Sequence, residues 1–138
     1  MNKALCYITS AYNTEDGYYS FAGIIRYEGK RYIITKVSND KILAPMKNVG
    51  AEIHGATEII KECIKLGIKR IDLYSYLQFI GDILNGTKKS KKQGVVNFLT
   101  FIRNNKQNIA INFIKAYKKD DIFSMKESKF ICKYMLHK

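Results

Sequence analysis

Apolar residues in the first third of the chain are grouped in the short runs that are typical of β-strands. Residues 3–9, 17–27 and 30–37 are rich in β-branched and aromatic side chains, which favour strands. Glu28 and Gly29 separate the second run from the third and indicate a hairpin. The three segments therefore predict an antiparallel unit.

The spacing of apolar residues then changes to that of a helix. Ile53, Ala56, Ile59 and Ile60 form one apolar stripe, so residues 48–66 are expected to form a helix packed on a core. The remaining predicted elements are a strand at 69–75, a short helix at 77–86, a basic run continuing as a helix at 87–108, a strand at 109–117 and an amphipathic helix at 123–136.

The order of these elements predicts an α/β fold. Strands that are separated by helices join a sheet as parallel neighbours through right-handed crossovers, whereas the first three strands are antiparallel. We expect a mixed five-stranded sheet with helices on both faces. A length of 138 residues fits one domain spanning 1–138.

Composition restricts where the protein functions. No apolar run is long enough to cross a bilayer, and we expect neither a signal peptide nor a membrane partner. Cys6, Cys63 and Cys132 have no metal-ligand spacing and lie in apolar segments. They are expected to be reduced core residues, which indicates a cytoplasmic protein.

Net charge suggests the kind of partner. Lys and Arg number 24 against 12 Asp and Glu, giving +12, which favours a polyanion such as nucleic acid. The alternative is that lysine is simply the default surface residue of the source organism, because most of the basic residues are lysines.

Four local motifs occur in an order that is known from one family. Residues 7–13 match Y-V-D-G-S-Y-N in part, residues 48–56 match N-x-x-G-E-x-x-x-A, residues 73–78 match I-Y-x-D-x-x, and residues 86–94 form a lysine-rich segment. With the element order, these motifs resemble the type 1 ribonucleases H that are related to viroplasmin-like proteins. The resemblance implies the ribonuclease H fold over nearly the whole chain.

The same resemblance implies a degenerate catalytic site. Family members cleave the RNA strand of RNA–DNA hybrids with two metal ions held by four carboxylates, because hard divalent cations take oxygen ligands. The matching positions here are Thr9, Glu52, Tyr76 and Lys129. An ammonium about 5 Å from a divalent ion would repel it by roughly 7 kcal/mol at an effective dielectric constant near 20. We therefore expect a pseudo-enzyme without metal or other cofactor, with Glu52 as the remnant.

Glu52 and its neighbours leave alternatives open. Glu52 is either part of this site or an ordinary helix-start carboxylate facing water. We hypothesise that Glu52 and Lys129 form an ion pair, with Tyr76 filling the vacated space and Thr9 donating a hydrogen bond. Lys129 on the exposed helix face is the alternative. A rearranged metal site would instead use Asp72, Asp120 or Asp121.

Nucleic-acid contacts are expected from two groups of residues. Asn48 and Gln78 match family positions that touch the groove of the hybrid, although both also fit structural roles at helix starts. Phosphate contacts are expected from lysines, unless these form only a solvated surface; they are Lys88, Lys89, Lys91, Lys92, Lys118 and Lys119.

These observations favour a catalytically inactive ribonuclease H-like domain that binds an RNA–DNA hybrid or duplex by shape and phosphate contacts. The first alternative is a protein-interaction module, such as a phage or mobile-element inhibitor that docks on an acidic protein or a ribonucleoprotein. The second is an active metal-dependent nuclease with a rearranged site.

Overall fold

Five strands form one mixed sheet in the computed structural model, which describes residues 2–87 and 89–138. The strands are β1 (Ala4–Tyr12), β2 (Tyr19–Tyr27), β3 (Lys30–Ser38), β4 (Arg70–Ser75) and β5 (Ala110–Lys115). Their order is β3-β2-β1-β4-β5, antiparallel among the first three and parallel for the pairs β1–β4 and β4–β5. The predicted mixed sheet is confirmed.

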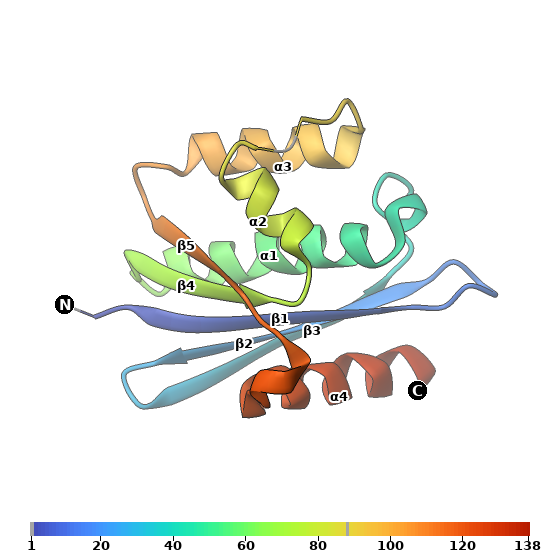
Figure 1. Cartoon of the computed structure of the whole chain (residues 1–138), viewed down its shortest axis with the longest axis horizontal. Coiled ribbons are helices and arrows are strands. Elements are labelled where there is room, and N and C mark those ends of the chain that lie inside the picture. The colour runs from blue at the N-terminus through green and yellow to red at the C-terminus, as the bar shows by residue number, and fades with distance from the viewer. Residues whose placement is uncertain (1, 88) are drawn as a thin grey trace.

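Helices cover both faces of this sheet, as predicted. The α-helices are α1 (Lys47–Lys65), α2 (Gln78–Leu84), α3 (Gln93–Asn104) and α4 (Phe123–His137), and two short 3-10 helices are η1 (Ala44–Met46) and η2 (Lys118–Asp120). Helices α1, α2 and α3 lie on one face and α4 lies on the other (Figure 1). All nine predicted strands and helices are present, with ends that differ by a few residues.

Two apolar layers hold the helices to the sheet. The larger core buries the predicted stripe of α1, including Ile53, Ile59 and Ile60, against β1 and β4. A smaller cluster that includes Tyr7, Ile24 and Met125 lies beneath α4. Since successive side chains of a strand point to opposite faces of the sheet, strand alternation decides which residues face α1.

The cysteines are buried thiols without a disulfide, as expected. Cys6 of β1 and Cys63 of α1 lie with their sulfur atoms 3.8 Å apart inside the larger core. None of the helices within residues 2–87 and 89–138 combines the length and the apolar character that crossing a membrane requires.

Gly55 lets α1 approach the sheet closely. A Cβ atom at this position would lie 2.1 Å from Cδ1 of Ile8 and 2.9 Å from the ring of Phe21. These distances are far below normal van der Waals contact, so a larger residue would push α1 outward. Gly55 follows Glu52 by three residues, about one turn, and therefore helps to set the distance between Glu52 and the strands.

We expect Gly55→Val to destabilise the fold by about 1–3 kcal/mol, because the added atoms overpack the contact between α1 and the sheet. Chemical denaturation measured by circular dichroism checks this. Lys61→Val places the same side chain at an exposed position of the same helix and should cost less than about 1 kcal/mol. Equal losses in the two variants would contradict the close-approach role of Gly55.

Candidate functional site

Glu52 is a buried carboxylate between α1 and the sheet. Its exposed fraction is 3%. One carboxylate oxygen accepts a hydrogen bond from Ser10 Oγ of β1 at 2.9 Å, and the other accepts a hydrogen bond from Ser75 Oγ at the end of β4. The alternative of a helix-start carboxylate facing water is therefore wrong.

Strand alternation explains why two serines meet Glu52. Cys6 and Ile8 of β1 lie in the core beneath α1, and Ser10 continues the same face two residues further on. Ile71 and Leu73 of β4 also lie in this core, and Ser75 continues their face of the sheet two residues further on. Because β1 and β4 are parallel neighbours, both hydroxyls come to the same end of the sheet beside α1.

Thr9 and Tyr76 lie on the opposite face, so their expected positions beside Glu52 are wrong. Thr9 Oγ1 lies 2.7 Å from Ser128 Oγ and 3.6 Å from the sulfur of Cys132, both on α4. Tyr76 packs against the apolar cluster under α4. In each strand segment, the residue that contacts Glu52 is one position away from the predicted residue. A shift of one residue along a strand moves the side chain to the other face of the sheet.

Two lysines bring positive charge to this site. Lys129 Nζ of α4 donates to the carbonyl oxygen of Ser10. Lys115, paired with Ser75 in the sheet, donates to the carbonyl oxygens of Tyr76 at 2.6 Å and Ala116 at 3.1 Å. Lys129 is half-buried, so it is not on the exposed helix face. The predicted direct ion pair with Glu52 is not among those formed within the described chain, although both lysines act on Glu52 electrostatically.

The protonation of Glu52 reflects a balance of burial and polar contacts. Burial raises the pKa of Glu52 to about 7, while hydrogen bonds from Ser75 and Ser10 and the charges of Lys129 and Lys115 act in the opposite direction. Desolvation outweighs these contacts. Glu52 is consequently poised between its neutral and charged forms near neutral pH.

The other candidate acids lie apart from Glu52. Asp72 and Tyr76 are an even number of residues apart along the β4 segment, so Asp72 points to the same face of the sheet as Tyr76. It pairs with Lys3 at 2.9 Å and accepts a hydrogen bond from Asn112 at 3.2 Å. Asp120 and Asp121 are exposed near η2, and Asp121 pairs with Lys126 at 2.6 Å. Over residues 2–87 and 89–138, no three His, Cys, Asp or Glu side chains gather in a way that could hold a metal.

The groups around Glu52 do not fit a pair of divalent cations. Both carboxylate oxygens already accept serine hydroxyls, and hydroxyls supply no negative charge to balance a metal. The nearby charges of Lys115 and Lys129 add repulsion.

Asn48 and Gln78 are both exposed, near the Glu52 end of the sheet. Asn48, on the first turn of α1, borders an open depression of about 390 Å³ together with Tyr12, Thr14 and Leu77. Gln78 begins α2, and its amide donates to Asp82 at 3.1 Å. Both amides therefore remain accessible for contacts with a ligand.

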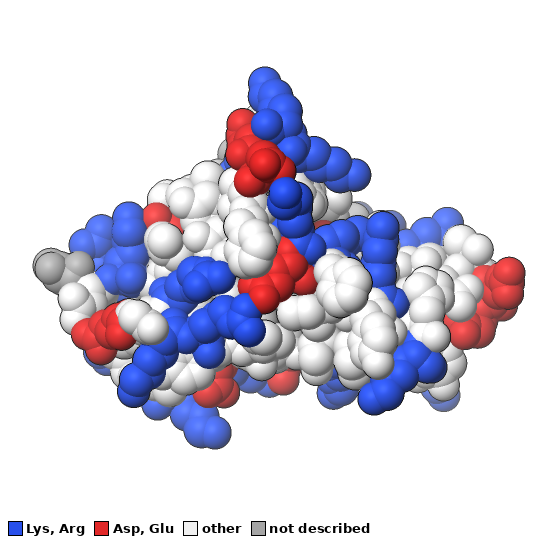
Figure 2. Space-filling view, turned by 90° about the horizontal axis from the view of Figure 1, so that it is seen from below, with Lys and Arg blue, Asp and Glu red and all other residues white. Residues whose placement is uncertain are grey.

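The candidate phosphate-binding lysines fall in two groups. Lys89, Lys91 and Lys92 are exposed just before α3, whereas Lys88 lies outside the described residues. Lys118 and Lys119 are exposed in η2, before α4. The start of α3 and η2 lie on opposite sides of the sheet layer (Figure 1). On the α4 side, blue lysine and arginine side chains are interspersed with red acidic side chains around uncharged surface (Figure 2).

Sequence reasoning missed Ser10 and Ser75 as the partners of Glu52. A signal for the serines is present in the pattern. Each follows two core residues at alternate positions, Cys6 and Ile8 in one strand and Ile71 and Leu73 in the other. This alternation places both serines on the same face of the sheet, once both strands are assigned to one core.

Comparison with solved structures identifies the fold. A ribonuclease H1 isolated from compost by a metagenomic approach has a TM-score of 0.76 at 13% identity, covering 99% of this chain and 97% of that one. The N-terminal ribonuclease H domain of a Mycobacterium tuberculosis protein has a TM-score of 0.73 at 10% identity, with 99% and 95% covered. No family model and no curated protein matches the sequence.

A third solved structure is the same compost ribonuclease H1 in complex with an RNA/DNA hybrid, with a TM-score of 0.72 at 12% identity, covering 91% of this chain and 92% of that one. These likenesses, together with the observed strand order, show that the chain has the ribonuclease H fold. The fold expected from the motif resemblance is thus confirmed.

We expect Glu52→Gln to remove a pH dependence of stability. Since the pKa rises from 4.5 to about 7 on folding, the folded protein binds more protons than the unfolded chain between these values. The uptake of this proton therefore stabilises the folded wild-type protein at low pH. About 3 kcal/mol of that stabilisation should be lost as the pH rises from 4.5 to 7–8. The variant should be close to wild type at pH 5 and more stable than wild type at pH 8.

Urea denaturation at both pH values measures this difference. Glu15→Gln is the matched control, because it removes the same charge from an exposed turn. A stability difference between wild type and Glu52→Gln that is the same at pH 5 and pH 8 would contradict the raised pKa of Glu52.

Proposed function

We propose that this protein is a catalytically inactive ribonuclease H-like domain that binds nucleic acid, as an RNA–DNA hybrid or a duplex, without cleaving it. The observation that carries the proposal is the surroundings of Glu52. This buried acid is held by two serine hydroxyls and lies in the field of two lysines. Metal-assisted phosphodiester cleavage needs several negatively charged ligands at this position.

Binding makes weaker demands on the site than cleavage does. Phosphate contacts from lysines depend on charge and shape, not on metal ligands, and they position a duplex without reading its sequence. The chain carries a net charge of +12, and Lys89, Lys91 and Lys92 are exposed together before α3. A loss of metal ligands thus leaves the means of binding in place.

The structural comparison supports the kind of ligand. One neighbour with the same fold is a ribonuclease H1 solved in complex with an RNA/DNA hybrid. Asn48 is exposed beside the open depression at the Glu52 end of the sheet, and Gln78 is exposed at the start of α2. We assign these two amides to groove contacts and the lysines to phosphate contacts.

We expect saturable binding of a labelled RNA–DNA hybrid that weakens steeply with salt. The triple variant Lys89→Gln, Lys91→Gln and Lys92→Gln should lower the affinity. It should also reduce the log–log salt slope by about 0.9 for each phosphate that is no longer neutralised. Fluorescence anisotropy at several salt concentrations measures both quantities.

The matched control replaces Lys30, Lys65 and Lys69 by Gln, which removes the same charge at exposed positions elsewhere. Equal losses in the two triple variants would refute the assignment to the segment before α3. No binding of hybrid, double-stranded RNA or single strands would refute the nucleic-acid proposal. Cleavage with Mg²⁺ or Mn²⁺ that Glu52→Gln abolishes would refute inactivity and establish a nuclease with a rearranged site.

A protein-interaction module is the second candidate function, and the outer face of α4 favours it. Phe123, Phe130 and Tyr134 are exposed at 66%, 71% and 58%, and the rings of Phe130 and Tyr134 are stacked, with centroids 6.5 Å apart. Exposed aromatic surface of this kind often marks a protein contact. Lysines on the same helix would suit an acidic protein or a ribonucleoprotein. This candidate predicts no nucleic-acid affinity and specific co-purification of one protein, lost in Phe130→Ser with Tyr134→Ser.

A further inference from the structure

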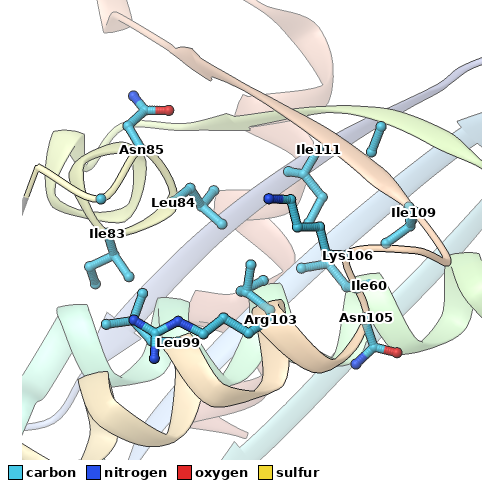
Figure 3. A pocket seen from close by; sticks show the side chains of 13 residues that line it. Ile60, Ile83, Leu84, Asn85, Leu99, Arg103, Asn105, Lys106, Ile109 and Ile111 are labelled. Atoms are coloured by element: carbon cyan, nitrogen blue, oxygen red, sulfur yellow. The ribbon is translucent and has the colours of Figure 1, made fainter.

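A second hollow lies away from Glu52, between three helices and the last strand (Figure 3). Its volume is about 500 Å³, which is in the range of small-molecule sites in proteins, roughly 300–1,000 Å³. Its walls are mostly aliphatic. The side chains that form them are Ile60 of α1, Ile83 and Leu84 of α2, Leu99 and Ile102 of α3, and Ile111 of β5.

These walls are incompletely covered by the protein itself. Leu84, Leu99, Ile102 and Ile111 are only partly buried, although they pack against the main core. Figure 3 shows side chains from separate elements facing the same space. Covering such apolar surface with an apolar ligand gains about 25 cal/mol for each Å² removed from water.

The charged side chains that line the hollow are all positive. Arg103, near the end of α3, and Lys106, in the turn that follows, both line it and are exposed. The other polar side chains are the amides of Asn85 and Asn105. Among the described residues, no Asp or Glu lines the hollow, and neither Arg103 nor Lys106 forms a salt bridge.

We propose that this hollow binds a small amphiphilic anion, a single apolar chain that ends in a carboxylate or a phosphate monoester. The apolar chain would cover the aliphatic walls, and the anionic end would pair with Arg103 and Lys106. A guanidinium group holds such oxyanions with paired hydrogen bonds, and an ammonium adds a second charge. A cationic amphiphile of the same length would meet like charge at the same place.

This site is independent of the proposed nucleic-acid function. It lies beside the first residues of β5, Ala110 and Ile111, whereas Glu52 meets the last residue of β4. Ile60 follows Glu52 by eight residues on α1, about 12 Å along the helix. Occupation of the hollow therefore needs no contact with the Glu52 site.

Titration with decanoate, kept below its self-association concentration, tests the proposal on the full chain. Methyl NMR should show saturable shifts of Ile60, Ile83, Ile102 and Ile111, with Ile33 and Ile42 unchanged as exposed references. Decyl phosphate should produce the same shifts. Decyltrimethylammonium at the same concentration should produce none.

Charge-removing variants separate the site from general hydrophobic binding. The double variant Arg103→Gln with Lys106→Gln should weaken decanoate binding about five- to tenfold, as expected for the loss of two exposed ion pairs, and should leave binding of neutral decanol unchanged. Lys65→Gln with Lys133→Gln removes two surface charges elsewhere and should change the affinity for neither decanoate nor decanol. Leu99→Trp, with folding checked by circular dichroism, should fill the hollow and abolish binding of both.

Four outcomes would overturn the proposal. One is equal affinity for decanoate and decyltrimethylammonium, and another is the same loss of affinity in both double variants. The third is a set of saturating shifts confined to methyl groups outside the hollow, and the fourth is no saturable shift at all. Each of these results leaves the nucleic-acid measurements unaffected, so the two proposals fail separately.

Discussion

The packing of α1 on the sheet is the constraint on which the site depends. Gly55 presents no side chain to Ile8 and Phe21, so the helix lies close enough for Glu52 to reach the strands. At that distance Glu52 is removed from water and must find its hydrogen bonds inside the protein. Ser10 and Ser75 supply them, one from each of two parallel neighbouring strands. The same packing that builds the core thus fixes the geometry of the polar cluster.

The charges around Glu52 then decide what chemistry the fold supports. The two hydroxyls satisfy the hydrogen bonds of the buried Glu52, but a divalent cation needs further anionic ligands. Here the additional charges come from Lys115 and Lys129, whose ammonium groups also donate to nearby backbone carbonyls. Under the proposed function, affinity for a polyanion relies on surface lysines, and phosphate contacts of this kind need no metal ligands.

Much of the fold could be predicted from the sequence because its signals are local. The stripe of Ile53, Ile59 and Ile60 specified a buried helix, and the residue pair Glu28–Gly29 specified the hairpin between β2 and β3. The motif resemblance also led to the correct fold, even though identity to the solved structures that share it is only 10–13%. Patterns of this kind do not depend on the precise placement of any one strand residue.

The site was less predictable because it depends on strand parity and on contacts across the sheet. Matching the motif at Thr9 and Tyr76 left each one residue from the side chain that meets Glu52, and that shift changes the face. Lys129 was expected to pair with Glu52 directly but bonds to the carbonyl of Ser10. The choice between a carboxylate and a carbonyl depends on side-chain geometry, which neither periodicity nor motif spacing specifies.

Paramagnetic broadening by Mn²⁺ in the NMR spectrum of the protein shows directly whether the Glu52 cluster admits a divalent cation. If the cluster excludes such ions, the amide signals of Ser10, Glu52 and Ser75 should broaden no more than those of the exposed turn at 14–16. The Glu52→Gln variant should give the same spectrum under titration. Selective, saturable broadening at these three residues that disappears in the variant would contradict the exclusion of metal from this site.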